Sequence, residues 1–169
     1  LLCLRDLKVS FYTEGKEARA VNGVSYDIYE GEIFGLVGES GSGKSVSALS
    51  MLKLIPQPPG KILSGSVLFE DKDLLQLPFE NLRKIRGNKI SMIFQEPVSS
   101  LNPVFTVGDQ LSEVLITHKN LNKKEALEDS AAMLKATGIP DAEKRLNDYP
   151  HQLSGGMCQR VMIAMALLC

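Results

Sequence analysis

The stretch Gly38-Glu39-Ser40-Gly41-Ser42-Gly43-Lys44-Ser45 decides the fold of this chain. The short apolar run Ile33–Val37 precedes it, and the run Val46–Leu52 follows it with apolar residues three positions apart. A short apolar run beside glycine is typical of a buried strand, whereas apolar residues at a spacing of three indicate one face of a helix. The sequence therefore predicts a strand, a glycine-rich loop and a helix, in that order.

The glycine-rich loop has the composition of a polyphosphate site. Glycine at 38, 41 and 43 lets successive backbone N–H groups curve around an anion, and the helix N-terminus adds partial positive charge there. Lys44 is expected to act as the catalytic cation on the β- and γ-phosphates, and the Ser45 hydroxyl to ligate Mg²⁺. We expect nucleotide contacts from the following residues: Gly38, Glu39, Ser40, Gly41, Ser42, Gly43, Lys44, Ser45 and Val46. A flexible glycine and serine turn is the alternative, but it does not explain the strand and helix on either side.

The composition narrows the class of protein. A length of 169 residues with 44% apolar residues fits one domain, or a domain with an insertion. The 19 basic and 20 acidic residues nearly cancel, so charge gives no argument for nucleic-acid binding. The longest apolar run, Val161–Cys169, is too short to cross a bilayer, so a membrane role must come through a partner. The cysteines are isolated, as in reduced cytosolic proteins, and a first residue other than Met suggests a trimmed chain.

The N-terminal half has the pattern of strands. Apolar and polar residues alternate through residues 1–37 and break at turn residues, which predicts paired strands ahead of the loop. Phe11 and Tyr12 lie near the end of the first strand, and either ring could stack on an adenine or simply fill the strand. Further elements are expected in this order: a strand at Ser64–Phe69, a short helix from Pro78, and a second buried strand at Ile90–Phe94 that ends in Gln95.

The segment 97–152 has helical spacing almost throughout. Thr106 is expected to cap one helix and Asn122 a second, which runs over Lys123–Thr137 and stops at Gly138. A third, shorter helical segment follows. We interpret residues 97–152 as an all-helical insertion in an α/β domain.

A second glycine motif, Leu153-Ser154-Gly155-Gly156-Met157-Cys158-Gln159-Arg160, opens the last helix. Ser154 is a good N-cap residue, and by itself the motif would indicate only a capped helix. Beside the phosphate loop it predicts a second anion site, because Ser-Gly-Gly at a helix N-terminus presents backbone N–H groups. The two sites need not bind the same nucleotide.

Together these motifs resemble the nucleotide-binding subunits of ABC transporters, in order and over the whole chain. Gly38–Ser45 matches the family's Walker A loop, and Gln95 its Q-loop glutamine. The segment Leu153–Met157 matches the family's signature, with methionine in place of the usual final glutamine. Phe11 lies near the family's adenine-stacking aromatic, with Tyr12 as the alternative.

Two longer segments, Phe94–Pro103 and Tyr149–Met157, are similar to the oligopeptide/dipeptide importer branch. The resemblance therefore implies an ATPase subunit of a peptide importer. Close relatives in that branch carry nickel and metal chelates, so an importer of such a solute is the alternative. A soluble ABC-type ATPase of DNA repair or translation is disfavoured by the neutral charge. A nonenzymatic interaction module would require a naturally short chain.

The resemblance implies an α/β fold with a P-loop NTPase (RecA-like) core, an N-terminal antiparallel β subdomain, an inserted α-helical subdomain, and a sheet left incomplete by C-terminal truncation. The implied divisions are 1–96 for the β subdomain and core, 97–152 for the insertion, and 153–169 for the signature and following helix. The family's Mg²⁺-ligating Asp, catalytic Glu and switch His would follow Cys169, and neither His118 nor His151 matches the switch position. We expect this chain to bind nucleotide without turning it over, and an unpaired sheet edge to lower its stability or promote self-association.

The resemblance also implies a mechanism. Two subunits meet head to tail with ATP and Mg²⁺ between them, and Ser45 and Gln95 contact the metal while Gln95 also contacts the attacking water. The signature acts in trans on the γ-phosphate held by the other subunit, through Leu153, Ser154, Gly155, Gly156 and Met157. The implied partners are a second ATP-binding subunit, transmembrane permease subunits and, indirectly, a substrate-binding protein, at the cytoplasmic face of the membrane and without nucleic acid.

Overall fold

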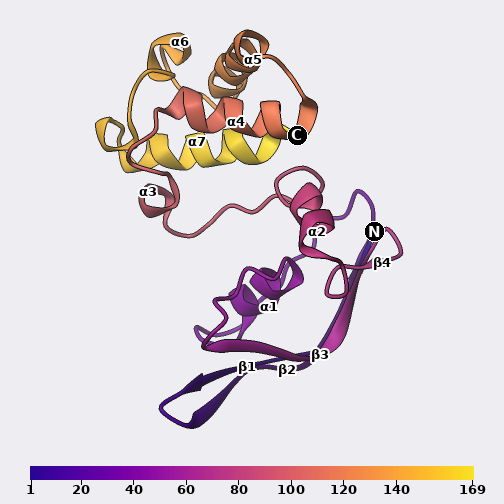
Figure 1. Ribbon diagram of the computed structural model, residues 1–169. Coiled ribbons are helices and arrows are strands. Elements are labelled where there is room, and N and C mark those ends of the chain that lie inside the picture. Colours follow the sequence, from indigo (N-terminus) through magenta and orange to yellow (C-terminus); the bar gives the residue numbers. More distant parts are fainter. The chain divides into compact units, whose positions relative to one another are not determined.

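A four-stranded antiparallel sheet forms the base of the N-terminal unit, residues 1–82, in the computed structural model, which describes all 169 residues (Figure 1). The strands are β1 (Leu2–Thr13), β2 (Lys16–Ile28), β3 (Gly60–Phe69) and β4 (Lys72–Asp73), in the order β2-β1-β3-β4. Thr13 pairs with Lys16 across a two-residue turn in which Glu14 and Gly15 have φ of 52° and 76°. That turn geometry suits the twist of a hairpin. The expected β-rich opening is confirmed.

Helix α1 (Lys44–Met51) lies against this sheet (Figure 1). Its buried positions are Ser47 and Ser50, while Val46 and Leu49 are only half-buried. The serine hydroxyls donate to backbone oxygens of their own helix, so small side chains bring α1 close to the sheet without an unpaired polar group. The expected helix is confirmed, but the expected apolar face was only partly right.

Neither of the two expected buried strands in the core is formed. Residues 33–37 have no strand pairing, and Ile33 and Val37 are 101% and 89% exposed. In the run Ile90–Phe94, Ile90 forms an isolated bridge with Arg86 and the rest is not in a strand. A strand exists only where a neighbour supplies backbone hydrogen bonds, and neither run has such a neighbour in this chain. The prediction of buried strands at these two runs is therefore wrong for this structure.

The second unit, residues 83–169, is helical. Helix α2 (Phe79–Ile85) begins just before it, as the expected helix from Pro78, and the later helices are α3 (Pro97–Ser100), α4 (Val107–Lys119), α5 (Lys123–Ala136), α6 (Ala142–Arg145), the short 3₁₀ helix η1 (Pro150–Gln152) and α7 (Gly155–Leu167). Helices α4, α5 and α7 pack around one apolar core (Figure 1). Fully buried members of that core include Val107, Leu111, Ala126, Leu134 and Val161.

The helix boundaries in this unit follow the expected caps. The Thr106 side chain accepts a hydrogen bond from the backbone N–H of Asp109. Asn122 and Glu125 form a reciprocal capping box at the start of α5, and Gly138 follows its end at a φ of 80°. The two helix starts are thus fixed by side-chain hydrogen bonds to backbone groups three residues away, and the end of α5 is followed by a glycine with a positive φ.

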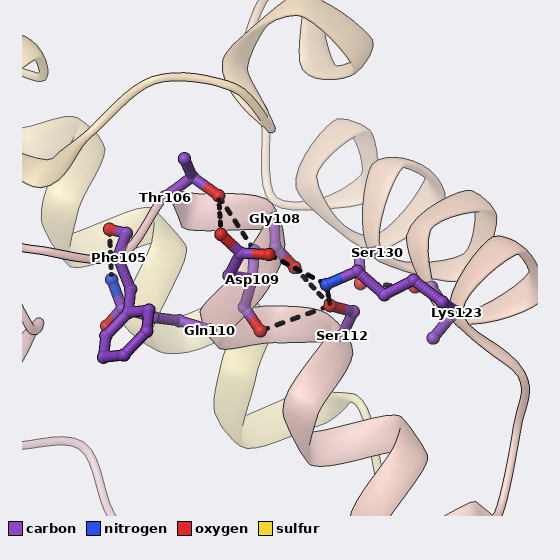
Figure 2. Close-up of polar contacts among 9 residues, drawn as sticks. Phe105, Thr106, Gly108, Asp109, Gln110, Ser112, Lys123 and Ser130 are labelled. Carbon is purple, nitrogen blue, oxygen red and sulfur yellow. Dashed lines mark hydrogen bonds and ion pairs between the residues drawn. The ribbon is translucent and has the colours of Figure 1, made fainter.

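Polar contacts tie the start of α4 to the start of α5, as Figure 2 shows. The Lys123 Nζ donates to Asp109 Oδ1 at 2.8 Å and to Ser112 Oγ at 3.0 Å, and the Thr106 hydroxyl donates to Asp109 Oδ2 at 2.8 Å. The Lys123 ammonium and the Thr106 hydroxyl hold the pKa of Asp109 below its usual value. Gln110 donates from its amide to the Asn102 and Phe105 backbone oxygens.

No helix of this chain has both the length and the apolar composition that a membrane-spanning segment needs.

Candidate functional site

The loop Gly38–Ser45 is held by glycines in backbone conformations that other residues rarely adopt. Gly41 and Gly43 have φ of 80° and 90°. A Cβ on Gly43 would lie 2.1 Å from the backbone oxygen of Ala20 in β2, whereas a Cβ on Gly41 would meet nothing within 4 Å. The loop therefore packs directly against the backbone of β2 at Gly43, where any residue with a Cβ would clash.

The side chain of Lys44 folds back over the loop. Its Nζ donates to the backbone oxygen of Gly38 at 2.7 Å, to that of Glu39 at 2.6 Å, and to Ser42 Oγ at 3.2 Å. The turn is closed by the backbone N–H of Ser42, which donates to the Glu39 oxygen at 3.2 Å. The ammonium group of Lys44 is thus surrounded by oxygen atoms of the loop.

The N-terminus of α1 continues this site. Gly43 is the N-cap and gives no side-chain cap, and no acidic residue stands in the first turn. The first N–H groups of a helix lack partners within the helix, so here they are left for another acceptor. Ser45 is exposed at the second helical position and Val46 is half-buried. A cation, N–H groups and a hydroxyl oxygen, with little side-chain bulk, are the donor set that a polyphosphate with Mg²⁺ requires, so the residues present fit that ligand.

One supporting residue was missed by sequence reasoning. The ring of Tyr26 in β2 stacks on Phe34 with centroids 5.0 Å apart, and its hydroxyl lies near enough to Ser47 of α1 for that serine to act on its pKa. Burial raises the pKa of Tyr26. Tyr26 thus braces the segment before the loop against the helix after it. The only sequence signal for Tyr26 was the alternation of apolar and polar residues in β2, and nothing in the sequence indicates that Tyr26 lies beside Phe34 and Ser47.

The two aromatic candidates for adenine stacking differ in environment. Phe11 pairs with Ala18 and Gly60 in the sheet, and its Cε1 lies 3.0 Å from where a Cβ on Gly60 would be. Tyr12 is 45% exposed, and its hydroxyl is 3.4 Å from Glu17 Oε1. Glycine at 60 thus makes room for the Phe11 ring, and stacking by either ring stays a prediction.

The second glycine motif, Leu153–Met157, contains residues exposed to solvent and residues packed against the helical core. Ser154 is the N-cap of α7, and its Oγ accepts a hydrogen bond from the Met157 N–H at 3.3 Å. Gly155 and Gly156 are exposed, and a Cβ on either would meet nothing within 4 Å. Leu153 and Met157 pack against the apolar core of the helical unit. No contact within the chain requires glycine at 155 and 156.

The remaining candidates lie in the helical unit. Gln95 is exposed in the segment before α3. His151 stacks on Tyr149 with ring centroids 5.6 Å apart, and His118 Nε2 lies near Gly87. Gln95 and the signature belong to residues 83–169 and the phosphate loop to residues 1–82, and their action on one reaction stays a prediction.

Comparison with known proteins places these features in context. Residues 21–169 match the family described as ABC transporter. The Bacillus subtilis (strain 168) dipeptide transport ATP-binding protein DppD is 52% identical over 169 residues, which is 100% of this chain and 50% of that protein. The Escherichia coli (strain K12) oligopeptide transport ATP-binding protein OppD is 51% identical over 169 residues, again 100% of this chain and 50% of that protein. The chain therefore spans about half the length of these relatives.

Solved structures give a concordant result. The dimeric ATP-binding cassette MJ0796, in a post-hydrolysis state bound to ADP and Pi, matches with a TM-score of 0.87 and 29% identity, over 99% of this chain and 69% of that chain. The cbiO1 protein of Clostridium perfringens, part of a transporter complex, matches with a TM-score of 0.69 and 27% identity, over 99% of this chain and 61% of that chain. These likenesses confirm the expected α/β P-loop fold class.

Proposed function

The chain belongs to the ABC transporter family, and from this premise we propose that it is the nucleotide-binding part of an ATPase subunit that powers uptake of dipeptides or oligopeptides. The observation that carries the proposal is the uncapped start of α1 with the Lys44 ammonium held in the loop before it. Peptide transport is supported by the names of relatives that are about half identical over the whole chain. No observation favours nickel as the solute.

In the proposed reaction the loop binds and orients the polyphosphate of ATP. Backbone N–H groups of the loop and of the first turn of α1 donate to phosphate oxygens, and Lys44 supplies the positive charge. Ser45 and Gln95 would hold Mg²⁺, which when bound neutralises charge on the β- and γ-phosphates. Gln95 also orients the attacking water. Phe11, with Tyr12 as the alternative, stacks on the adenine.

The signature is proposed to act on a nucleotide held by a second subunit that is bound head to tail. Gly155 and Gly156 are exposed, with open space around them, so their backbone can approach a phosphate closely. The Ser154 Oγ uses a lone pair in its cap, which leaves its hydrogen to donate to the γ-phosphate. Leu153 and Met157 fix the motif to the helical core. One side chain thus both starts the helix and contacts the ligand.

The proposed assembly is peripheral to a membrane. Permease subunits in the membrane, with a substrate-binding protein acting through them, would receive the conformational change at the cytoplasmic face. We assign residues 1–96 to the β subdomain and core, 97–152 to a helical insertion that contacts the permease, and 153–169 to the signature and its helix. The rest of the core would lie in sequence beyond these residues.

Phosphate release from ATP tests the proposed function. We expect a chain extended to the length of the relatives to hydrolyse ATP with Mg²⁺, because it would contain the catalytic Glu that the family places after the signature helix. The 169-residue chain should bind ATP and release no phosphate above background. Both chains are measured at equal concentration with Mg²⁺ and again with excess chelator. Equal rates from the two chains would contradict the proposal.

Ser154→Ala is expected to separate the two roles of the signature serine. Loss of the N-cap bond should lower the free energy of unfolding of the helical unit by about 1 kcal/mol. Nucleotide affinity of a single chain should not change, while ATP hydrolysis by the assembled transporter should fall about tenfold or more, since a charge-assisted donor is lost. Ser154→Asp is the matched control, because it keeps a good N-cap and removes the hydroxyl donor. If Ser154→Asp hydrolyses ATP at the unaltered rate, the serine acts only as a cap.

A further inference from the structure

The ammonium group of Lys44 has no hydrogen left for a ligand. Such a group carries three hydrogens, and here three acceptors surround it: the backbone oxygens of Gly38 and Glu39 at 2.7 and 2.6 Å, and Ser42 Oγ at 3.2 Å. All three acceptors belong to the loop itself. A phosphate oxygen can therefore bind Lys44 only by taking the place of one of them.

The three acceptors are not equally easy to displace. The two backbone oxygens make short bonds and are held by the turn that the Ser42 N–H closes on Glu39. The Ser42 hydroxyl makes the longest bond, and it can rotate about its side chain without a change in the backbone. Its exposed position also lets water take up the hydroxyl once it is released. The hydroxyl is the partner that costs least to give up.

The position of the Ser42 hydroxyl depends on its surroundings in the loop. Its Oγ lies 2.8 Å from where a Cβ on Gly38 would be, so the glycine makes room for the serine to point across the loop. The Lys44 side chain passes through the same space, with its Cδ 3.8 Å from that Cβ position. Because Gly38 has no side chain, both the Lys44 side chain and the Ser42 hydroxyl fit beside it.

We propose that Ser42 is a positioning residue whose hydroxyl occupies, in the nucleotide-free loop, the hydrogen-bond position on Lys44 that a phosphate oxygen of ATP takes. This inference rests on the proposed nucleotide-binding function. Two effects of the hydroxyl oppose each other, since it holds the ammonium in the loop and it competes with the phosphate. Competition is the larger effect, because the two shorter bonds to backbone oxygens hold the ammonium whether or not Ser42 takes part. Removing the hydroxyl should therefore tighten binding.

The test compares nucleotide affinities of variants of the full-length protein by calorimetry, with Mg²⁺ and ATP, ADP or AMP. Ser42→Ala should bind ATP and ADP about threefold to tenfold more tightly, the equivalent of one hydrogen bond, and AMP with unchanged affinity. Ser42→Thr keeps the hydroxyl, so its ATP affinity should lie closer to that of the unaltered protein than to that of Ser42→Ala. Ser64→Ala, an exposed serine in β3, controls for a general effect of losing a hydroxyl.

A second measurement reports on Lys44 without nucleotide. Exchange of the Lys44 ammonium hydrogens with water, followed by ¹⁵N NMR in selectively labelled protein, should be faster in Ser42→Ala than in Ser42→Thr. If the unaltered protein binds ATP but Ser42→Ala binds it equally or more weakly, the inference is wrong and the proposed function stands. Unchanged exchange in Ser42→Ala would likewise overturn the inference alone. If the unaltered protein binds no nucleotide, both the proposed function and the inference fail.

Discussion

Lys44→Ala is expected to abolish the stabilisation of this protein by ATP. The substitution removes the one ammonium that the loop surrounds, and with it a charge-assisted hydrogen bond to a phosphate oxygen and the attraction of the positive charge for the phosphates. A loss of about 3 kcal/mol of binding free energy corresponds to about a hundredfold weaker affinity. Because stabilisation by a ligand grows as RT ln(1 + [L]/Kd), the rise in melting temperature at an MgATP concentration about tenfold above the Kd of the unaltered protein should be close to zero in Lys44→Ala.

The measurement is thermal unfolding with and without MgATP, for the altered and unaltered protein. Without nucleotide, Lys44→Ala should melt close to the unaltered protein, since the loop is exposed and water can satisfy the freed backbone oxygens. Lys16→Ala, an exposed lysine at the β1–β2 turn, is the matched control and should keep the full response to ATP. An ATP-dependent rise that survives in Lys44→Ala would end the assignment of this loop as the nucleotide site.

Gly43→Ala is expected to destabilise residues 1–82 by about 2–5 kcal/mol, the sum of two costs. A φ of 90° is a strained conformation for any residue with a Cβ, which costs about 1–2 kcal/mol. The new methyl group would also lie 2.1 Å from the Ala20 backbone oxygen, so β2 or the loop must move, at a further cost of about 1–3 kcal/mol. Because the loop would leave its seat on β2, nucleotide affinity should fall as well.

Gly41→Ala separates the two sources of that cost. Gly41 has a similar φ of 80°, but a Cβ there meets nothing within 4 Å, so only the backbone strain of about 1–2 kcal/mol is expected. Urea unfolding followed by circular dichroism measures both variants. Equal losses of stability for the two variants would show that the contact between Gly43 and Ala20 does not constrain the loop.

Local features of this fold could be predicted from the sequence. Thr106, Asn122 and Ser154 cap their helices as expected, and Gly138 ends α5. Each of these caps is a hydrogen bond or a backbone angle confined to residues three or four apart. The chemistry of the partners is therefore present in the adjacent sequence. The same holds for the phosphate loop, whose glycines and lysine form one continuous stretch.

Strands could not be predicted with the same success. The runs Ile33–Val37 and Ile90–Phe94 have the apolar character of buried strands but are not paired in this structure. β1 is paired on both sides, because the hairpin brings β2 to one edge and β3 returns to the other. A strand is a property of two segments, and an apolar pattern in one segment does not say whether its partner is present.

The sequence by itself determined the order of loop and helix, the caps, the two glycine motifs and the family. Only the tertiary structure decided that Gly43 faces the Ala20 oxygen, that α1 buries serines, and that Lys44 is saturated by its own loop. The physical reason is the reach of the interactions. Caps and turns join neighbours along the chain, whereas a close approach, a buried face or a strand pairing joins residues that only folding brings together.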